Sequence, residues 1–420
     1  NTFRLRGHEE ASGTAYYPEG MIEEWTKQDP ISNYEQFLLS EGILTQNLIE
    51  EIKNAFKKDV DNALDETIAE PEIIPNRKVE LENVYAPFSN KEILPEKLQN
   101  RELRFIDAIS EALEISMKNH PNLVLMGQDI AEYGGAFKIT EGFVEKFGKK
   151  RVRNTPLCEA AIVGSSLGLS INGYKSMVEM QFADFVTEGF NQIINNLAKT
   201  HYRWNQNADV LVRMPTGAGT GAGPFHSQSN EAWFTKTPGL KIAYPAFPDD
   251  AKGLLIQSFE DPNPVLFFEH KKLYRSLKGN VPEGFYTTPF GKARKIKEGK
   301  DLTIITYGLG VHIALEFAEK NPEISLEIVD LRTLIPLDTE TIYESVRKCN
   351  KVIILHEDTL TCGFGAEISA LISEHCFEDL DAPILRVASM DTPIPFNKKL
   401  EDQFMPNEEL TEAINKLLNY

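Results

Sequence analysis

The sequence predicts an α/β protein built on mainly parallel sheets with helices on both faces. From about residue 101 onward, short apolar runs typical of buried strands alternate with amphipathic stretches typical of helices. The chain has 420 residues and is 41% hydrophobic, which is enough for two or three packed domains.

Residues 1–90 differ in texture from the rest. Residues 1–30 are irregular, and residues 33–68 carry apolar positions at three-and-four spacing, which predicts a helix with Thr45 as an N-cap and Ile49, Ile52 and Phe56 on its buried stripe. After Ala69 the chain is acidic and holds three prolines up to Pro87, which predicts an extended linker.

Residues 91–287 are expected to form the second domain and residues 288–420 a third, compact α/β unit with its own core. The strands expected in these two domains are 122–130, 151–154, 174–182, 208–215, 241–247, 264–270, 301–308, 326–331, 351–357 and 383–388. The helices expected there are 104–121, 140–149 with Thr140 as a cap, one opening at Glu159, 185–204, 251–260, 311–320, 337–348 and 363–376.

The net charge of −19 argues against a nucleic-acid binder and against binding to an anionic membrane surface. No apolar run reaches the length of a membrane span. The four cysteines form no CxxC pair, which favours reduced thiols in a cytoplasmic protein over a zinc or redox motif.

Glu159 is the one acid in the small, apolar run TPLCEAAIVGSSLGLS. A carboxylate in an apolar site is costly without a partner, and no cation lies nearby in the sequence. Two interpretations stay open from the residues alone: an exposed first-turn acid favoured by the helix dipole, or a positioned proton donor or acceptor.

Two histidines are further candidates. His226 follows a glycine-rich loop, where it is either an ordinary loop residue or a proton shuttle; the loop lacks the Lys-Ser/Thr of a P-loop and the GxGxxG spacing. His8 follows Arg4 and Arg6, which together make either a basic surface turn or an anion site.

Four more side chains lie at element boundaries. Gln181 and Phe185 fall at a strand–helix junction, where Phe185 is either core or a ring that packs on a bound heterocycle. Asp261 and Asn263 are most simply turn residues, or oxygen ligands for a cation.

These strings together resemble one family. NTPLCEAAIVG, EMQFADF, FHSQSNEAWF, PGLKI, EDPNPV, LYR and GFGAEIS look like the β subunit of the thiamine-diphosphate-dependent decarboxylating component of 2-oxoacid dehydrogenase complexes, over roughly residues 100–420. NTPLCE and QFAD resemble the branched-chain enzyme more than the pyruvate enzyme. TFRLRGHEE and WTKQDPI resemble the end of the α subunit, so the chain resembles an α–β fusion.

The resemblance implies a transketolase-like pyrimidine-binding domain and a smaller transketolase C-terminal domain after a helical α-subunit remnant. It implies that Glu159 binds the aminopyrimidine, which Leu157, Gln181 and Phe185 would line. His226 would serve acyl transfer, and Arg4 and His8 would face the diphosphate. Many relatives have Tyr where Phe185 stands. Asp261 and Asn263 match a potassium site of some relatives.

Partners follow from the same resemblance. They are a 2-oxoacid substrate, a dihydrolipoyl acyltransferase with its lipoyl domain, and a second copy of the chain, giving a homodimer equivalent to two α and two β subunits. The family holds Mg²⁺ and the diphosphate with a GDG motif, which is missing from this sequence. The chain alone is therefore expected to bind thiamine diphosphate weakly.

Three alternatives remain open at this point. One is the pyruvate-specific enzyme, and another is transketolase, which would need a GDG and sugar-phosphate ligands in the same chain. The third is a non-catalytic docking fragment of the complex.

Overall fold

The computed structural model describes residues 2–96 and 99–420, which divide into two compact units, Asn1–Asn76 and Arg77–Tyr420. Helices make up the first unit: the 3-10 helix η1 (Glu10–Ser12), α1 (Met21–Thr26), α2 (Pro30–Ser40) and α3 (Gln46–Ala69). Across the described residues, every helix is too short or too polar to cross a bilayer.

The single helix predicted over residues 33–68 is in fact two helices. Gly42, with a φ of 68°, ends the first, and the Thr45 hydroxyl accepts the N–H of Leu48 at 3.2 Å, which confirms Thr45 as the N-cap of α3. The predicted buried stripe is wrong in part. Ile49 is buried, but Ile52 and Phe56 are 53% and 70% exposed within this chain.

The linker prediction also needs correction, because α4 (Arg77–Glu82) lies within it. The segment after α4 belongs to the second unit and is anchored to the rest of it. The Tyr85 hydroxyl donates to the carbonyl of Leu240, and the Ala86 N–H donates to Asn263 Oδ1 at 2.8 Å.

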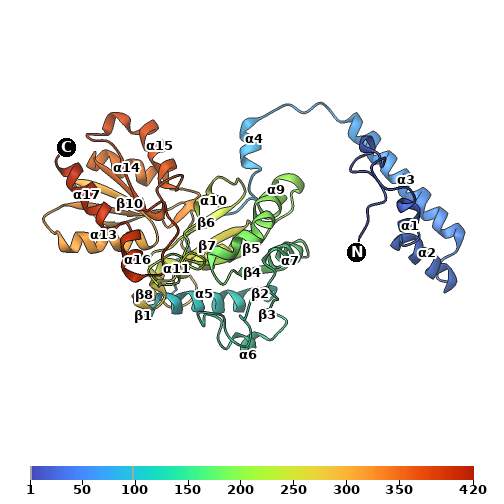
Figure 1. Ribbon diagram of the computed structural model, residues 1–420, viewed down its shortest axis with the longest axis horizontal. Helices are drawn as coiled ribbons and strands as arrows, with labels where there is room; N and C mark the ends of the chain where they lie inside the picture. The colour runs from blue at the N-terminus through green and yellow to red at the C-terminus, as the bar shows by residue number, and fades with distance from the viewer. Residues whose placement is uncertain (1, 97–98) are drawn as a thin grey trace. The chain divides into compact units, whose positions relative to one another are not determined.

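Two large sheets organise the second unit, with helices on both sides of the strands (Figure 1). All neighbouring strands of the two sheets are parallel except the edge pairs β12–β6 and β11–β9. The seven-stranded sheet has the order β12 (Thr333–Ile335), β6 (Lys241–Ala243), β7 (Val265–His270), β5 (Val210–Thr216), β4 (Lys175–Glu179), β2 (Leu123–Gly127), β3 (Val152–Asn154). The five-stranded sheet has the order β14 (Leu385–Ser389), β13 (Val352–Thr359), β10 (Leu302–Thr306), β11 (Leu326–Asp330), β9 (Arg294–Lys297).

The helices that cover these sheets largely match the expected ones. They are α5 (Phe105–Asn119), α6 (Phe143–Phe147), α7 (Glu159–Ile171), α8 (Val186–Asn191), α9 (Ala198–Trp204), α10 (Ala232–Thr235), α11 (Pro248–Glu260), α12 (Leu273–Ser276), α13 (Leu309–Lys320), α14 (Thr339–Cys349), α15 (Gly365–His375), α16 (Lys398–Phe404) and α17 (Asn407–Leu418). A π-helical segment, Gln192–Leu197, joins α8 to α9, and short 3-10 turns lie at Ala183–Phe185 and Phe377–Asp379.

Several elements were not expected from the sequence. They are the two-stranded antiparallel sheet of β1 (Asn100–Arg104) and β8 (Lys278–Pro282), the short strands β9 and β12, the short helices α10 and α12, and the last two helices, α16 and α17. Thr140 does not cap α6, because its hydroxyl donates to the carbonyl of Ile130, and α6 begins after Gly142.

The hydrophobic core runs through both sheets. Successive residues of β2 point to opposite faces, so that Leu125 joins one buried cluster and Val124 the other. The first cluster also contains Ile304 of β10, so the C-terminal segment shares a core with the seven-stranded sheet instead of having one of its own. Strand β12, which comes from residues 333–335, completes that sheet at its edge.

A buried ion cluster lies at the centre of the seven-stranded sheet. Arg213 of β5 is 0% exposed and donates to Glu269 of β7 at 2.6 and 2.7 Å and to Glu179 of β4 at 2.6 Å. The Tyr274 hydroxyl donates to the same Glu269 carboxylate. Burial and the nearby charge of Glu269 outweigh the attraction of Arg213 and raise the pKa of Glu179.

We predict that Arg213→Met destabilises the protein by about 3–5 kcal/mol, because two buried carboxylates lose the cation that pairs with both of them. The urea midpoint measured at pH 8 checks this. The loss should be smaller at pH 5, because the raised pKa of Glu179 lets this carboxylate take up a proton more readily there. Lys292→Met, at an exposed position, should leave the midpoint unchanged, and an equally small effect at Arg213 would contradict the assignment.

Candidate functional site

The candidate residues of the second unit gather where parallel strands end. Gln128 follows β2, Gln181 follows β4, and the loop 217–231 with His226 follows β5. The carboxyl ends of parallel strands share one edge of a sheet, which is where α/β proteins place their sites. This placement agrees with the sequence expectation for Gln181 and His226.

Glu159 is the first residue of α7 and is 9% exposed. Its partner is an amide: Gln128 Nε2 donates to Glu159 Oε1 at 2.9 Å. Gln128 Oε1 is buried and accepts no hydrogen bond from the described part of the chain. The lone carboxylate of the sequence is therefore oriented by a neutral donor that sequence reasoning missed.

Close helix packing fixes the backbone at Glu159. Gly189 of α8 lies against the first turns of α7, and a Cβ there would stand 3.2 Å from Val163 Cγ2 and 3.5 Å from the Glu159 carbonyl oxygen. Part of the small-residue surface of α7 is also used within the chain, because Gly164 faces the side chain of Gln192. Some of the small residues of α7 thus allow close packing against other helices of the same unit, and not against a partner subunit alone.

Gln181 and Phe185 lie at the strand–helix junction after β4, and His226 contacts it. Gln181 Nε2 donates to Asp129 Oδ2 at 3.3 Å. The ring of His226 lies 4.7 Å from that of Phe182 and 5.5 Å from that of Phe185, both in edge-on geometry. His226 is therefore held against the strand–helix junction after β4.

One continuous path links Glu159 to His226. Glu159 bonds Gln128, whose neighbour Asp129 accepts from Gln181. The residue after Gln181 is Phe182, and its ring contacts His226.

The groups around Glu159 fit an aminopyrimidine ring. The carboxyl group has one oxygen held by Gln128 and one to offer, and Gln128 Oε1 is a further acceptor for an amino group. Phe185 is half-buried and Leu157 is 81% exposed, so both have apolar surface for a flat ring. These four residues would hold such a ring, with Glu159 as the group that can carry a proton.

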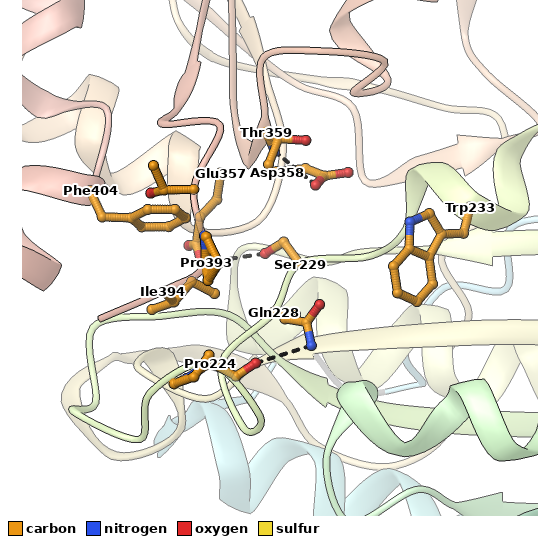
Figure 2. Close-up of a pocket in the computed structure, with 11 residues that line it drawn as sticks. Pro224, Gln228, Ser229, Trp233, Glu357, Asp358, Thr359, Pro393, Ile394 and Phe404 are labelled. Atoms are coloured by element: carbon orange, nitrogen blue, oxygen red, sulfur yellow. Dashed lines mark hydrogen bonds between the residues drawn. The ribbon is translucent and has the colours of Figure 1, made fainter. Parts of the chain in front are cut away.

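A cavity of about 330 Å³ lies beyond the His226 loop, between that loop and the C-terminal segments (Figure 2). Pro224, Gln228, Ser229 and Trp233 line it from one side, and Glu357 and Asp358 at the end of β13 line it from the other. Neither Glu159 nor Leu157 contributes to this lining. The cavity is thus separate from the residues that fit the ring.

Three acids lie close together beside this cavity. Burial and the neighbouring charge of Glu357 raise the pKa of Asp358 to about 7, and burial and Asp358 raise that of Glu231 well above its usual value. Burial also acts to raise the pKa of Glu357. The charge of His270 and its hydrogen bond to Glu357, at 2.5 Å, outweigh the effect of burial. The pKa of Glu357 is therefore lowered.

Asp261 and Asn263 are engaged with the fold. Lys241 Nζ donates to Asp261 Oδ2, Asn263 donates to Asp261 Oδ1 at 2.8 Å, and Ala86 N–H occupies Asn263 Oδ1. A potassium ion at these oxygens would have to compete with the Lys241 ammonium, so the geometry does not favour the predicted cation site. The described residues contain no cluster of three His, Cys, Asp or Glu side chains placed to hold a metal ion.

Arg4 and His8 lie in the first unit and are both exposed. The Tyr17 hydroxyl donates to the Arg4 carbonyl, and hydrogen bonds to Tyr16 and Tyr17 raise the pKa of Arg4. The guanidinium therefore already uses part of its hydrogen-bonding capacity on the two tyrosines, although the residue is exposed. Whether these two residues meet Glu159 or His226 stays a prediction.

Comparisons with known proteins agree with these features. Residues 101–276 match the family described as "Transketolase, pyrimidine binding domain", residues 291–410 match "Transketolase, C-terminal domain", and residues 1–76 match "Dehydrogenase E1 component". A solved chain described as a split-gene transketolase, an inactive beta4 tetramer, has a TM-score of 0.61 at 24% identity and covers 76% of this chain and 98% of its own, which shows the fold.

Among curated proteins, the chain is 46% identical to the 2-oxoisovalerate dehydrogenase subunit beta of Bacillus subtilis over 74% of this chain and 97% of that protein. It is 42% identical to the mitochondrial 2-oxoisovalerate dehydrogenase subunit beta 2 of Arabidopsis thaliana, over 76% and 90%. It is 40% identical to the pyruvate dehydrogenase E1 component subunit beta of Bacillus subtilis, over 76% and 99%.

We predict that the protein loses stability as the pH rises from 5 to 8. The native state keeps a proton on Asp358 up to about pH 7, whereas the unfolded state has released it, so deprotonation favours unfolding. Asp358→Asn should flatten this slope and raise the melting temperature at pH 8. The exposed Asp402→Asn is the control, and an identical slope in both variants would refute the assignment.

Proposed function

This chain belongs to the family of 2-oxoacid dehydrogenase E1 components, with a β-subunit sequence that follows a "Dehydrogenase E1 component" segment, and from this premise we propose that it decarboxylates branched-chain 2-oxoacids with thiamine diphosphate. The acyl group would pass to the lipoyl group of an acyltransferase. The observation that carries the proposal is Glu159, a nearly buried carboxyl group oriented by Gln128 with one oxygen left to bind a ligand.

Thiamine diphosphate, when bound, supplies the nucleophilic carbon and the electron sink that decarboxylation requires. Glu159 would bind the aminopyrimidine nitrogen and hold or release a proton at its carboxyl oxygen. Gln128 keeps that carboxyl group in place. Leu157, Gln181 and Phe185 would line the ring, and Phe185 has no hydroxyl to donate, unlike tyrosine.

His226 is the proposed acid–base group for acyl transfer. It is half-buried on a loop and contacts Phe182 and Phe185, so its ring is oriented but accessible. Arg4 and His8 would add positive charge for the diphosphate. We do not assign Mg²⁺ or K⁺ to residues of the second unit, because the sequence has no GDG and Asp261 already binds Lys241.

The partners we propose are an acyltransferase with its lipoyl domain and a second copy of the chain. All four cysteines are free thiols, which supports a reducing compartment such as the cytoplasm. Pyruvate is the second candidate substrate, because the pyruvate dehydrogenase relative is nearly as similar, at 40% identity.

We predict that Glu159→Gln lowers decarboxylation at least about 100-fold with the melting temperature unchanged, because the amide cannot exchange a proton. Dye reduction by the assembled enzyme, with 2-oxoisovalerate and with pyruvate, measures this. The branched substrate should be preferred at least about tenfold in kcat/KM. Glu145→Gln, at an exposed acid of α6, is the control. Near-normal turnover by Glu159→Gln would refute the role of Glu159, and a preference for pyruvate would replace the substrate assignment.

We predict that His226→Ala lowers lipoyl acylation by about 100-fold while dye-linked decarboxylation changes much less, because only the acylation step needs the imidazole proton. Running both assays on one preparation gives the ratio directly. His375→Ala, at an exposed histidine of α15, should leave both rates unchanged. Equal losses in the two assays would show that His226 serves an earlier step.

A further inference from the structure

The loop before His226 has an unusual backbone. Gly217, Gly219, Gly221 and Gly223 all have left-handed φ angles, of 91°, 84°, 72° and 71°. Backbone of this kind turns successive N–H groups toward one side and forms a concave site for an anion. The sequence of this loop lacks the signatures of a phosphate-binding loop. The structure shows which groups its N–H donors bind instead.

Carboxylates of the C-terminal segment fill this concave site. Glu401 of α16, 3% exposed, accepts the N–H of Gly219 at 2.8 Å and that of Gly221 at 3.0 and 3.1 Å. Glu357 of β13 accepts the N–H of Ala218 at 2.6 Å. Hydrogen bonds to a charged acceptor are the strong ones, and these lie largely away from water.

Side chains pack closely on the loop at three of its four glycines, Gly217, Gly219 and Gly223. A Cβ at Gly217 would stand 2.0 Å from the His270 ring, and one at Gly223 would stand 2.3 Å from the Phe396 ring. Lys271 Nζ also donates to the Gly217 carbonyl at 2.7 Å. Side chains from other segments therefore hold the backbone of the loop in place.

The fixed loop leads directly to His226. The His226 N–H donates to the Gly223 carbonyl at 3.3 Å. On the far side, Asp184 Oδ1 accepts both the N–H and the side-chain amide of Gln228, at 3.2 and 3.0 Å. His226 thus lies between an anchor on the C-terminal segment and an anchor on the strand–helix junction after β4.

We propose that Glu401 is a positioning residue for His226. Its carboxylate occupies the backbone anion site at Gly219 and Gly221 and so holds the loop in the conformation that places the imidazole against Phe182 and Phe185. The C-terminal domain thereby takes part in acyl transfer without touching the reacting atoms. This inference rests on the proposed role of His226 in that step.

Amide hydrogen exchange of the full chain tests the anchor itself. In Glu401→Ala, amides of the peptide covering 217–223 should exchange at least about tenfold faster, because strong hydrogen bonds are lost. Glu401→Gln keeps one acceptor oxygen and should fall between Ala and wild type. Asp402→Ala, the next residue on α16 and exposed, should match wild type. Unchanged exchange in Glu401→Ala would overturn the proposal.

Activity and labelling then test the positioning. Glu401→Ala in the assembled enzyme should lose about tenfold in lipoyl acylation and less than twofold in dye-linked decarboxylation, with partial rescue in Glu401→Gln. If acylation is unchanged while His226→Ala impairs it, Glu401 does not position His226. If both variants acylate normally, the proposed function of His226 fails instead. Carbethoxylation of His226, mapped by mass spectrometry, then decides: faster labelling in Glu401→Ala supports the positioning, and equal labelling overturns it.

Discussion

The buried contact of Arg213 with Glu179 and Glu269 is the constraint on which the site depends. One residue from each of three adjacent strands, β4, β5 and β7, takes part in it, and all three side chains are buried. A slip of one residue in any of these strands would turn a charge toward apolar neighbours, at a cost of several kcal/mol. The register is therefore fixed, and with it the strand ends that lead to Gln181 and to the glycine loop.

The acids near the site share an unexpected kind of partner. Glu159 accepts from an amide side chain, Asp184 from the amide and N–H of Gln228, and Glu401 from backbone N–H groups. None of these contacts needs a cation. A chain with a net charge of −19 has far more carboxylates than lysines and arginines to pair with them, and N–H donors orient an acid without neutralising it.

Much of the fold was predictable because it follows local rules. The Thr45 cap and the alternation of strands and helices after residue 101 depend on neighbours in the sequence, and dense motifs indicated Glu159 and His226. The partners were not predictable. Gln128 lies 31 residues from Glu159, and Glu401 lies about 180 residues from the glycines it contacts. Strand β12 has only three residues and lies beyond a turn, so no periodicity marks it. The predicted stripe of α3 failed in part because helical periodicity shows which face is apolar and not what covers it.

Strand β12 has a consequence for where such a chain can be divided into separate genes. It comes from the C-terminal segment but pairs with β6, so a division near residue 288 would leave the first product with an open sheet edge and the second with an orphan strand. A division near residue 76 would cut no strand pairing among the described residues, because all of these strands follow it. The sheet topology therefore favours a gene division or fusion near residue 76, between the E1-type segment and the β-type segment, over one near residue 288.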